Sequence, residues 1–262
     1  MPTVNEQSQL AVFIDFENLA LGIQPKTGNN GRRRKRTEKL DMALVLERLV
    51  EKGKIVAKRA YCDWQRFPEY VVQLHELGIE LIEIPDRYMT GKNSADIRLV
   101  VDALEMGFQK DHIDTYVIVS GDSDFLPLVS KLRENGKTII GVGLKDSTSD
   151  LLANNCDEFI FYDDIGTGKE MPKIGDNVTR KQAPAYKLLF ETIDAMQRDS
   201  TAKMHSSLIK DTIRRKKPQF SERSYGYRSF NQLLEDAQAK GYIEISKDER
   251  SGTYVVEGFA SK

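Results

Sequence analysis

The alternation of two kinds of apolar segment along the first part of the chain is the feature that most restricts its fold. Short runs rich in β-branched residues, suited to buried strands, alternate with longer segments whose apolar residues recur at helical spacing. The strand-like runs are residues 10–15, 54–62, 79–85, 115–121, 137–143 and 158–163. The helical segments are residues 42–53, 69–78, 94–108 and 124–136, the third with Ser94 as its expected N-cap. Strands separated by helices need crossover connections, so the sequence predicts an α/β fold with a mainly parallel sheet.

The chain after residue 165 has a different pattern of segments. Residues 166–184, GTGKEMPKIGDNVTRKQAP, lack apolar periodicity and are predicted to be a linker. Beyond it, three helical segments (185–197, 205–217 and 229–241) precede two strand-like runs (242–246 and 253–258) that suggest a hairpin. Three helices and a hairpin are the parts of a winged helix. We therefore predict two domains, residues 1–165 and 185–262, joined by residues 166–184.

The overall composition excludes few classes of partner, but it indicates the cellular compartment. The formal net charge is -1, so charge alone favours neither nucleic acid nor a membrane surface as a partner. The two cysteines, Cys62 and Cys156, lie far apart without metal-site spacing, which argues against a disulfide framework and favours a cytoplasmic location. No stretch approaches the roughly 18 apolar residues of a membrane span, and residues 1–10 carry no signal pattern. No membrane association is expected.

Four aspartates are expected at the carboxyl ends of the predicted strands. Asp15 ends the first strand, Asp122 and Asp124 follow the fourth, and Asp96 opens the helix before the fourth. Open parallel sheets bind ligands where the winding direction reverses, so these acids would meet in one crevice if the first and fourth strands are neighbours. Two uncompensated unit charges 4 Å apart repel by about 4 kcal/mol at an effective dielectric near 20. A hard divalent cation removes that cost, and ligands that are all oxygen suit Mg²⁺ or Mn²⁺ better than Zn²⁺.

Each acid also has an ordinary interpretation, because an aspartate at a strand end or helix start is most often a cap or a solvated loop residue. The conjunction of four such positions favours a metal site over four unrelated caps.

Other chemistries fit less well: the chain has no glycine-rich cradle for a nucleotide and no motif for a Ser-His-Asp triad. A haloacid-dehalogenase-like phosphatase would need an aspartate two residues after Asp15, where this chain has Glu17. Asp102, further along the helix of Asp96, is interpreted as a surface residue.

Several of these segments together resemble a known family. FIDFEN, SADIRLVVDAL and VIVSGDSDFLPLVSKLRENGKTIIGVG resemble the NYN domains of the PIN-like nuclease superfamily, in particular its LabA-like branch, over residues 9–163. The resemblance implies a Rossmann-like α/β/α sandwich that hydrolyses RNA phosphodiester bonds with a bound metal. Position by position, it implies a catalytic set of Asp15, Asp96, Asp122 and Asp124 as ligands of Mg or Mn, with Asn18 and Ser120 orienting them.

The C-terminal part resembles a second family. HSSLIKDTIRRKKPQFSERSYGYRSFNQLLEDAQAKGYIEI is similar to the OST-HTH, or LOTUS, domain, and the likeness covers about residues 185–258. Such domains are similar to winged helices. The resemblance implies binding of RNA or, as in some relatives, of a protein partner.

Two basic stretches could bind the RNA backbone. GRRRKR lies between the first predicted strand and the first predicted helix and contributes Arg32, Arg33, Arg34, Lys35 and Arg36, although a solvated loop explains it equally well. The second consists of Arg214, Arg215, Lys216 and Lys217. Tyr225 and Tyr227 follow it and could stack on bases, whereas Phe230 is expected in the core.

The sequence thus predicts a two-domain endoribonuclease that uses Mg or Mn and acts on RNA, with single-stranded RNA as the expected form. The alternative is a non-catalytic RNA-binding or regulatory adaptor that uses the same fold as a scaffold. The four acids favour the enzyme, because an adaptor has no need of converging carboxylates. The oligomeric state is not predicted.

Overall fold

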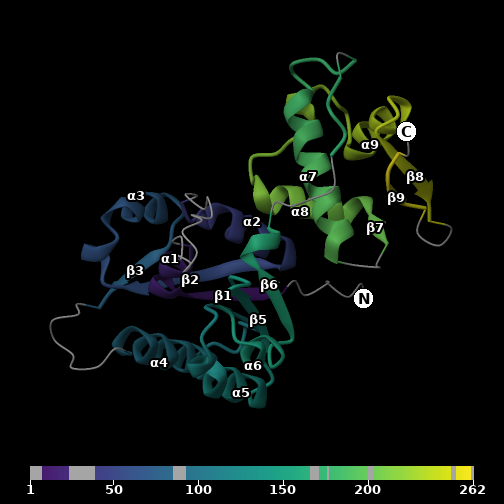
Figure 1. The fold of residues 1–262 in the computed structure, drawn as a ribbon. Coiled ribbons are helices and arrows are strands. Elements are labelled where there is room, and N and C mark those ends of the chain that lie inside the picture. Colours follow the sequence, from purple (N-terminus) through teal and green to yellow (C-terminus); the bar gives the residue numbers. More distant parts are fainter. Residues whose placement is uncertain are drawn as a thin grey trace. The chain divides into compact units, whose positions relative to one another are not determined.

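The computed structural model describes residues 8–23, 39–84, 93–165, 171–175, 177–199, 203–248 and 252–260. The chain forms two compact units, Met1–Gly166 and Thr167–Lys262 (Figure 1). Apolar side chains of the first unit form two clusters, one on each face of a sheet, and those of the second unit form a separate core. Within the described residues, none of the helices is long and apolar enough to cross a membrane.

The first unit is built on a six-stranded sheet in the order β3-β2-β1-β4-β5-β6. All of its strand pairs are parallel. Its strands are β1 (Gln9–Asp15), β2 (Lys54–Cys62), β3 (Glu80–Glu83), β4 (Thr115–Val119), β5 (Thr138–Gly143) and β6 (Glu158–Phe161). The predicted α/β fold is confirmed. The first and fourth strands are neighbours, which was the condition for the acids to meet in one crevice. The winding direction reverses between β1 and β4, which makes their carboxyl ends the expected ligand site.

Helices cover both faces of this sheet. Those of the first unit are α1 (Phe16–Ile23), α2 (Met42–Lys52), α3 (Pro68–Glu76), α4 (Ser94–Gln109), α5 (Leu126–Glu134) and α6 (Asp150–Ala153). The first three pack on one face and the last three on the other (Figure 1). Because β1 is covered on both faces, it is apolar at nearly every position: Leu10, Val12 and Ile14 point to one layer, and Ala11 and Phe13 to the other.

Local details differ from the sequence expectations at two helix starts. Helix α1 begins directly after Asp15, so the run GRRRKR lies between α1 and α2 and does not directly follow the first strand. Ser94 is the first residue of α4 and not its N-cap, a position taken by Asn93 without a side-chain capping bond.

The expectation that Asp102 is a surface residue is wrong, because α4 turns this side chain toward the sheet and leaves it only 5% exposed. Its carboxylate accepts a hydrogen bond from the Tyr61 hydroxyl group of β2 at 3.0 Å and from Arg98 Nε at 2.9 Å. The guanidinium of Arg59 lies 3.8 Å away. These contacts attach α4 to β2 through a buried, paired carboxylate.

The second unit is winged-helix-like. Its helices are α7 (Ala183–Asp199), α8 (Ser206–Lys216) and α9 (Phe230–Ala239), and its strands are β7 (Met204–His205), β8 (Ile243–Lys247) and β9 (Tyr254–Phe259). The strands pair antiparallel in the order β7-β9-β8. The hairpin of β8 and β9 is the predicted one, whereas the two-residue β7 was not expected.

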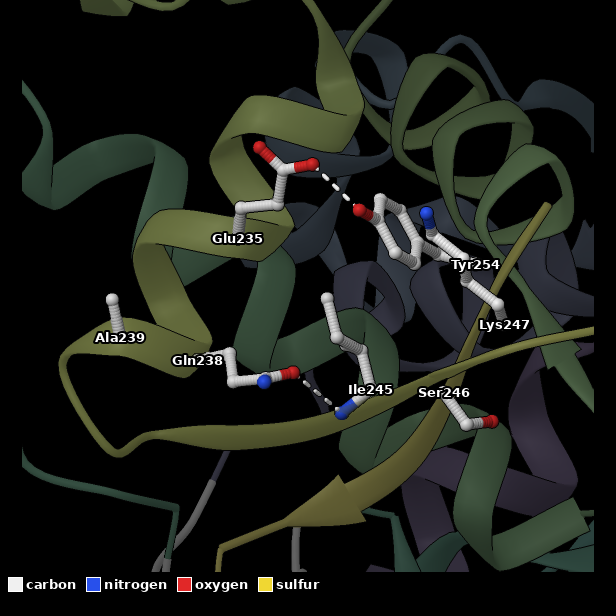
Figure 2. Close-up of a pocket in the computed structure, with 7 residues that line it drawn as sticks. All are labelled: Glu235, Gln238, Ala239, Ile245, Ser246, Lys247 and Tyr254. Atoms are coloured by element: carbon white, nitrogen blue, oxygen red, sulfur yellow. Dashed lines mark hydrogen bonds between the residues drawn. The ribbon is translucent and has the colours of Figure 1, made fainter. Parts of the chain in front are cut away.

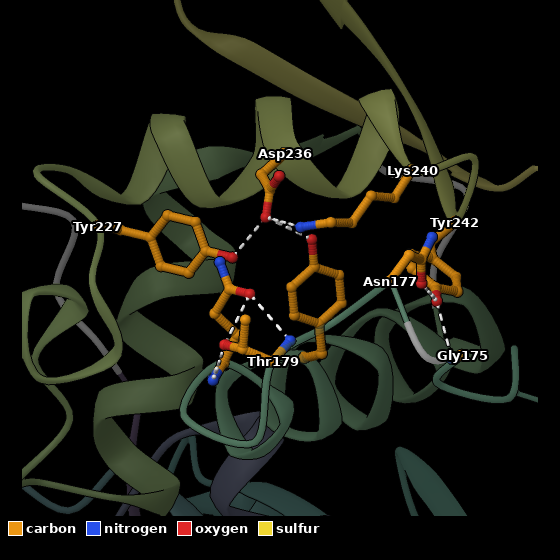
Figure 3. Close-up of polar contacts among 9 residues, drawn as sticks. Gly175, Asn177, Thr179, Tyr227, Asp236, Lys240 and Tyr242 are labelled. Atoms are coloured by element: carbon orange, nitrogen blue, oxygen red, sulfur yellow. Dashed lines mark hydrogen bonds and ion pairs between the residues drawn. The ribbon is translucent and has the colours of Figure 1, made fainter.

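One carboxylate ties the helices of the second unit together. Asp236 of α9 accepts hydrogen bonds from the hydroxyl groups of Tyr186 at 2.8 Å and Tyr227 at 2.5 Å, and from Lys240 Nζ at 2.5 Å (Figure 3). These bonds together hold the pKa of Asp236 below its ordinary range against the opposing effect of burial. The network links α7, α9 and the segment between α8 and α9.

Part of the segment expected as a linker packs on this second unit. The Tyr242 hydroxyl group accepts from the Gly175 backbone N–H at 2.9 Å and donates to Asn177 Oδ1 at 2.7 Å (Figure 3). Val178 is 8% exposed and lies in the core of the unit. The segment at Gly175, Asn177 and Val178 is therefore attached to the fold that follows it.

Candidate active site

Asp15 lies at the centre of the crevice between β1 and β4. It is the last residue of β1, and its side chain is only 5% exposed. Oδ1 accepts a hydrogen bond from the Asn18 backbone N–H at 3.2 Å, and Oδ2 accepts one from the Ser120 hydroxyl group at 2.9 Å. Because α1 starts at once, its first turn supplies the Asn18 donor. Both carboxylate oxygens are thus fixed in orientation.

Asn18 and Ser120 also join the segments that leave the two central strands. Asn18 Oδ1 accepts from the Gly121 backbone N–H at 3.3 Å, and the fully buried Ser120 Oγ accepts from the Asp122 backbone N–H at 3.2 Å. Gly121 is required by close approach: a Cβ there would lie 2.7 Å from the Ser147 carbonyl oxygen. The turn after β4 is therefore held against α1 on one side and against residues 147–148 on the other.

Asp122 and Asp124 lie on this same turn. Asp122 caps the short 3₁₀ helix Ser123–Phe125 by accepting from the Asp124 backbone N–H at 3.0 Å. Asp124 is exposed, and its Oδ2 accepts from Asn93 Nδ2 at 3.3 Å. Since Asn93 directly precedes α4, this bond connects the turn to the helix that carries Asp96.

The four acids influence one another electrostatically. Burial, and then the charges of Asp96 and Asp122, raise the pKa of Asp15 from 3.8 to about 7, although the bonds from Ser120 and Asn18 oppose the rise. Burial, and then the charges of Asp122, Asp124 and Glu17, raise the pKa of Asp96 to about 6. Strongly raised pKa values in a crevice are typical of functional sites. Both values reflect burial first and the charges of the neighbouring carboxylates second.

The donor set fits a hard divalent cation. All four side chains offer carboxylate oxygens, which Mg²⁺ and Mn²⁺ prefer, and among the described residues none of the four acids forms an ion pair with a lysine or arginine. Across the described part of the chain, no three acidic, histidine or cysteine side chains lie close enough to form a ready coordination group. The acids are gathered at one crevice but not drawn together into a coordination shell. A cation would therefore have to draw them closer.

Three neighbours of the acids were not singled out from the sequence. Glu17 forms an ion pair with Arg66, which follows β2, so a cation approaches the crevice from that side. Asn93 bonds to Asp124 across the turn. The position of Glu17, two residues after Asp15, is a visible signal, but nothing in the sequence identifies Arg66 or Asn93.

The predicted RNA-binding residues have different outcomes. Arg32, Arg33, Arg34, Lys35 and Arg36 lie outside the described residues. In the second unit, Arg214 and Lys217 are exposed, and Arg215 and Lys216 are half-buried. Tyr225 is half-buried, with its ring stacked on Phe220 at a centroid distance of 5.5 Å and with Lys217 Nζ 5.9 Å from its centroid.

Tyr227 does not suit base stacking, contrary to the expectation from sequence. It is 4% exposed, and its hydroxyl group is bonded to Asp236. The ring belongs to the core of the second unit, as Phe230 does. Tyr227 is close in sequence to a basic run, but its side chain packs in the core.

A pocket of about 330 Å³ lies between α9 and the β8–β9 hairpin of the second unit (Figure 2). Two pairs of its lining groups bond to each other: the Tyr254 hydroxyl group donates to Glu235 at 2.7 Å, and Gln238 Oε1 accepts from the Ile245 backbone N–H at 3.1 Å (Figure 2). Because Glu235, Gln238 and Tyr254 are already hydrogen-bonded, they are less suited to bind a ligand or react than the acids of the crevice between β1 and β4.

Comparisons with known proteins agree with the fold and point to a family. A crystal structure of a protein of unknown function from Vibrio parahaemolyticus superimposes with a TM-score of 0.50 at 22% identity, covering 61% of this chain and 96% of that one. An uncharacterised protein of Methanocaldococcus jannaschii is 31% identical over 121 residues, which span 46% of this chain and 47% of that protein. The match thus covers about half the length of each protein. Residues 9–163 match the family model of the NYN domain, so the chain belongs to the NYN domain family of PIN-like nucleases.

Proposed function

We propose that the first unit is a metal-dependent ribonuclease that cleaves RNA internally at the crevice between β1 and β4. The observation that carries the proposal is the buried carboxylate of Asp15, whose pKa is raised to about 7 beside Asp96 and Asp122. A fold gains nothing in stability from crowding like charges around a buried acid. Such crowding is useful when a cation and a phosphate are to be bound there.

Asp15, Asp96, Asp122 and Asp124 would hold Mg²⁺ or Mn²⁺. When bound, such a cation can activate water and offset the negative charge that develops on a phosphoryl group. The protein's own contribution is orientation. The Ser120 hydroxyl group and the Asn18 backbone N–H fix both oxygens of Asp15, so this ligand is already placed before a cation binds.

Asn18 has a second role in this proposal. Its Oδ1 faces the Gly121 backbone N–H, so the Nδ2 group on the other arm of the amide points away from that bond and can donate to a phosphate oxygen. Asn18 would thus position the phosphodiester beside Asp15. Exposed Asp124 lies at the edge of the crevice, where single-stranded RNA would enter.

The second unit is proposed to bind RNA and so to raise the affinity of the whole chain for its substrate. Arg214, Lys216, Lys217 and the accessible part of Tyr225 are the residues that suit a phosphate backbone and a stacked base. The other class of protein, a non-catalytic RNA-binding or regulatory adaptor, needs the same basic surface but no ionised acids in the crevice. A test of cleavage therefore separates the two classes.

The decisive experiment compares cleavage of end-labelled single-stranded RNA by wild type and by Asp122→Asn. The substitution keeps the shape of the side chain and removes one charge from the crevice, so we expect cleavage to fall by at least about a hundredfold while RNA binding persists. Wild-type cleavage should stop in EDTA and return with added Mn²⁺ or Mg²⁺.

The matched control is Asp111→Asn, which neutralises an exposed aspartate in the turn after α4, away from the crevice. It should cleave at the wild-type rate. Undiminished cleavage by wild type in EDTA with trace metal removed would exclude the metal-dependent mechanism. No cleavage by wild type with any divalent cation, together with RNA binding, would support the adaptor.

A further inference from the structure

Helix α4 presents apolar side chains on two opposite sides. Leu99 and Ala103 are fully buried against the sheet. On the other side, Ile97, Val101 and Phe108 are 59%, 52% and 58% exposed. Partly buried Leu104 lies on the same line, because steps of four, three and four residues return to one side of a helix. We name these four residues, Ile97, Val101, Leu104 and Phe108, the α4 stripe.

We propose that the α4 stripe is the surface by which two copies of this chain pair, α4 against α4, antiparallel and related by a two-fold axis. Apolar residues scattered singly on a surface are normal, whereas a contiguous exposed set marks an interaction site. The alternating spacing of four and three residues is the pattern with which one helix packs along another. The proposal concerns association and does not depend on the nuclease activity.

The charges beside the stripe favour a second copy of the same chain as the occupant. Arg98 and Glu105 lie on the same border of the stripe, seven residues or about two turns apart. In an antiparallel two-fold pair, Arg98 faces the partner's Glu105, and the reverse contact forms at the same time. On the other border, Val100 and Gly107 carry no charge. A parallel pair would instead place Arg98 and Glu105 opposite the uncharged border of the partner, where neither finds an opposite charge.

The apolar and charged contacts require nearly the same register. Pairing Arg98 with the partner's Glu105 centres the two helices between Val101 and Asp102. The middle of the α4 stripe lies between Asp102 and Ala103, one residue further on. The two alignments therefore differ by two residues, about 3 Å of helix rise, which the long side chains of Arg98 and Glu105 can span.

Existing contacts already orient both charged side chains. Arg98 uses Nε to donate to buried Asp102 at 2.9 Å, and its side chain remains 56% exposed. Glu105 Oε1 accepts from Gln109 Nε2 at 2.9 Å, and among the described residues its other oxygen makes no hydrogen bond. Holding the arginine in place reduces the conformational entropy lost on pairing.

The test measures self-association of the full-length chain by sedimentation velocity from about 1 to about 200 μM, a range that brackets a weak helix-to-helix contact. Wild type should shift from monomer to dimer across this range. Val101→Asp should raise the dissociation constant about tenfold or more, because the two-fold axis brings each substitution into the interface twice. Thermal melting of each variant shows whether its fold is kept.

Val72→Asp is the matched control, since Val72 on α3 is 67% exposed and takes the same change outside the stripe. It should associate as wild type does. Wild type that stays monomeric at every concentration overturns the proposal, and this is the result expected if the second unit or a different protein covers the stripe. Dimerisation that survives Val101→Asp, or that both substitutions abolish equally, also overturns it.

A charge reversal tests the orientation. Glu105→Lys places a cation opposite the partner's Arg98 in an antiparallel pair, so the dissociation constant should rise, and the rise should shrink at high salt. In a parallel pair, Glu105 would face the partner's uncharged border, and reversal would leave the dissociation constant nearly unchanged. Glu76→Lys, which reverses an exposed charge on α3, is the control. An unchanged dissociation constant for Glu105→Lys contradicts the antiparallel register.

Discussion

At the scale of single residues, Asp15 governs the electrostatics of the candidate site. It combines deep burial with two hydrogen-bond donors, from Ser120 and Asn18, that favour its ionised form. Burial and the neighbouring acids outweigh these donors, so the balance raises the pKa to about 7. A carboxyl group with this balance exchanges its proton easily near neutral pH and releases it when a cation arrives.

This balance predicts how the stability of the metal-free protein changes with pH. The folded-state pKa values of Asp15 (about 7) and Asp96 (about 6) lie above the ordinary value of 3.8. Between these limits the folded state keeps protons that the unfolded chain has released, so the stabilisation is complete below about pH 4 and is lost as the pH rises to about 7. Melting temperatures in EDTA should show this fall in wild type.

Asp15→Asn removes the titrating group and should make the pH dependence in that window shallower. Asp111→Asn, an exposed aspartate away from the crevice, should retain the wild-type slope. Equal slopes for wild type and Asp15→Asn would show that Asp15 titrates near its ordinary pKa. Added Mn²⁺ should raise the melting temperature of wild type more than that of the variant.

At the scale of helices and strands, what could be read from the sequence depended on length and burial. The central strands β1, β4 and β5 were the most predictable, because parallel strands covered on both faces are apolar at almost every position. Helix α1 was missed although Phe16, Leu19, Ala20 and Ile23 have helical spacing, because eight residues are too few for periodicity alone to distinguish a helix.

The sequence likewise predicted some features of the candidate site and not others. The acids stand at strand ends and helix starts, which local patterns locate. The bonds that organise them join residues far apart in sequence, as between Asn18 and Gly121 or Asn93 and Asp124, and depend on how the turns meet. Asp102 was misjudged for the same reason, because only the packing of α4 on β2 shows that it is buried.

The attachment of α4 to β2 gives a prediction at this scale. Asp102→Ala should lower the free energy of unfolding by about 1–3 kcal/mol, because it leaves the buried Tyr61 hydroxyl group without its acceptor. Tyr61→Phe should cost less, and the double variant should cost less than the sum of the single ones. Urea denaturation of the four proteins measures this coupling. Strictly additive values would contradict the proposed attachment.

At the scale of the whole molecule, the two units have separate cores, and part of the segment between them belongs to the second. Tyr242 binds Gly175 and Asn177, and Val178 is buried. A fragment of residues 167–262 should therefore fold alone and melt at a higher temperature than a fragment of residues 183–262. Equal melting temperatures would show that these contacts contribute nothing to stability.

The fragments also separate binding from chemistry. Residues 1–166 should cleave RNA but bind it more weakly than the full chain, since a tethered second unit raises affinity through effective concentration. Residues 167–262 should bind labelled RNA, more weakly at higher salt, and never cleave it. If this fragment shows no affinity for RNA even at low salt, its basic surface is better suited to a protein partner.

The bond between Ser120 and Asp15 joins residues that lie 105 positions apart in the chain. A ribosome adding about 5–20 residues per second would release Ser120 many seconds after Asp15. Until β4 emerges and inserts beside β1, Asp15 has neither its hydroxyl donor nor two of its three acidic neighbours. The crevice therefore cannot be complete on a nascent chain truncated before residue 124. If the crevice cleaves RNA as proposed, the protein would stay inactive while the first half of the chain is being translated.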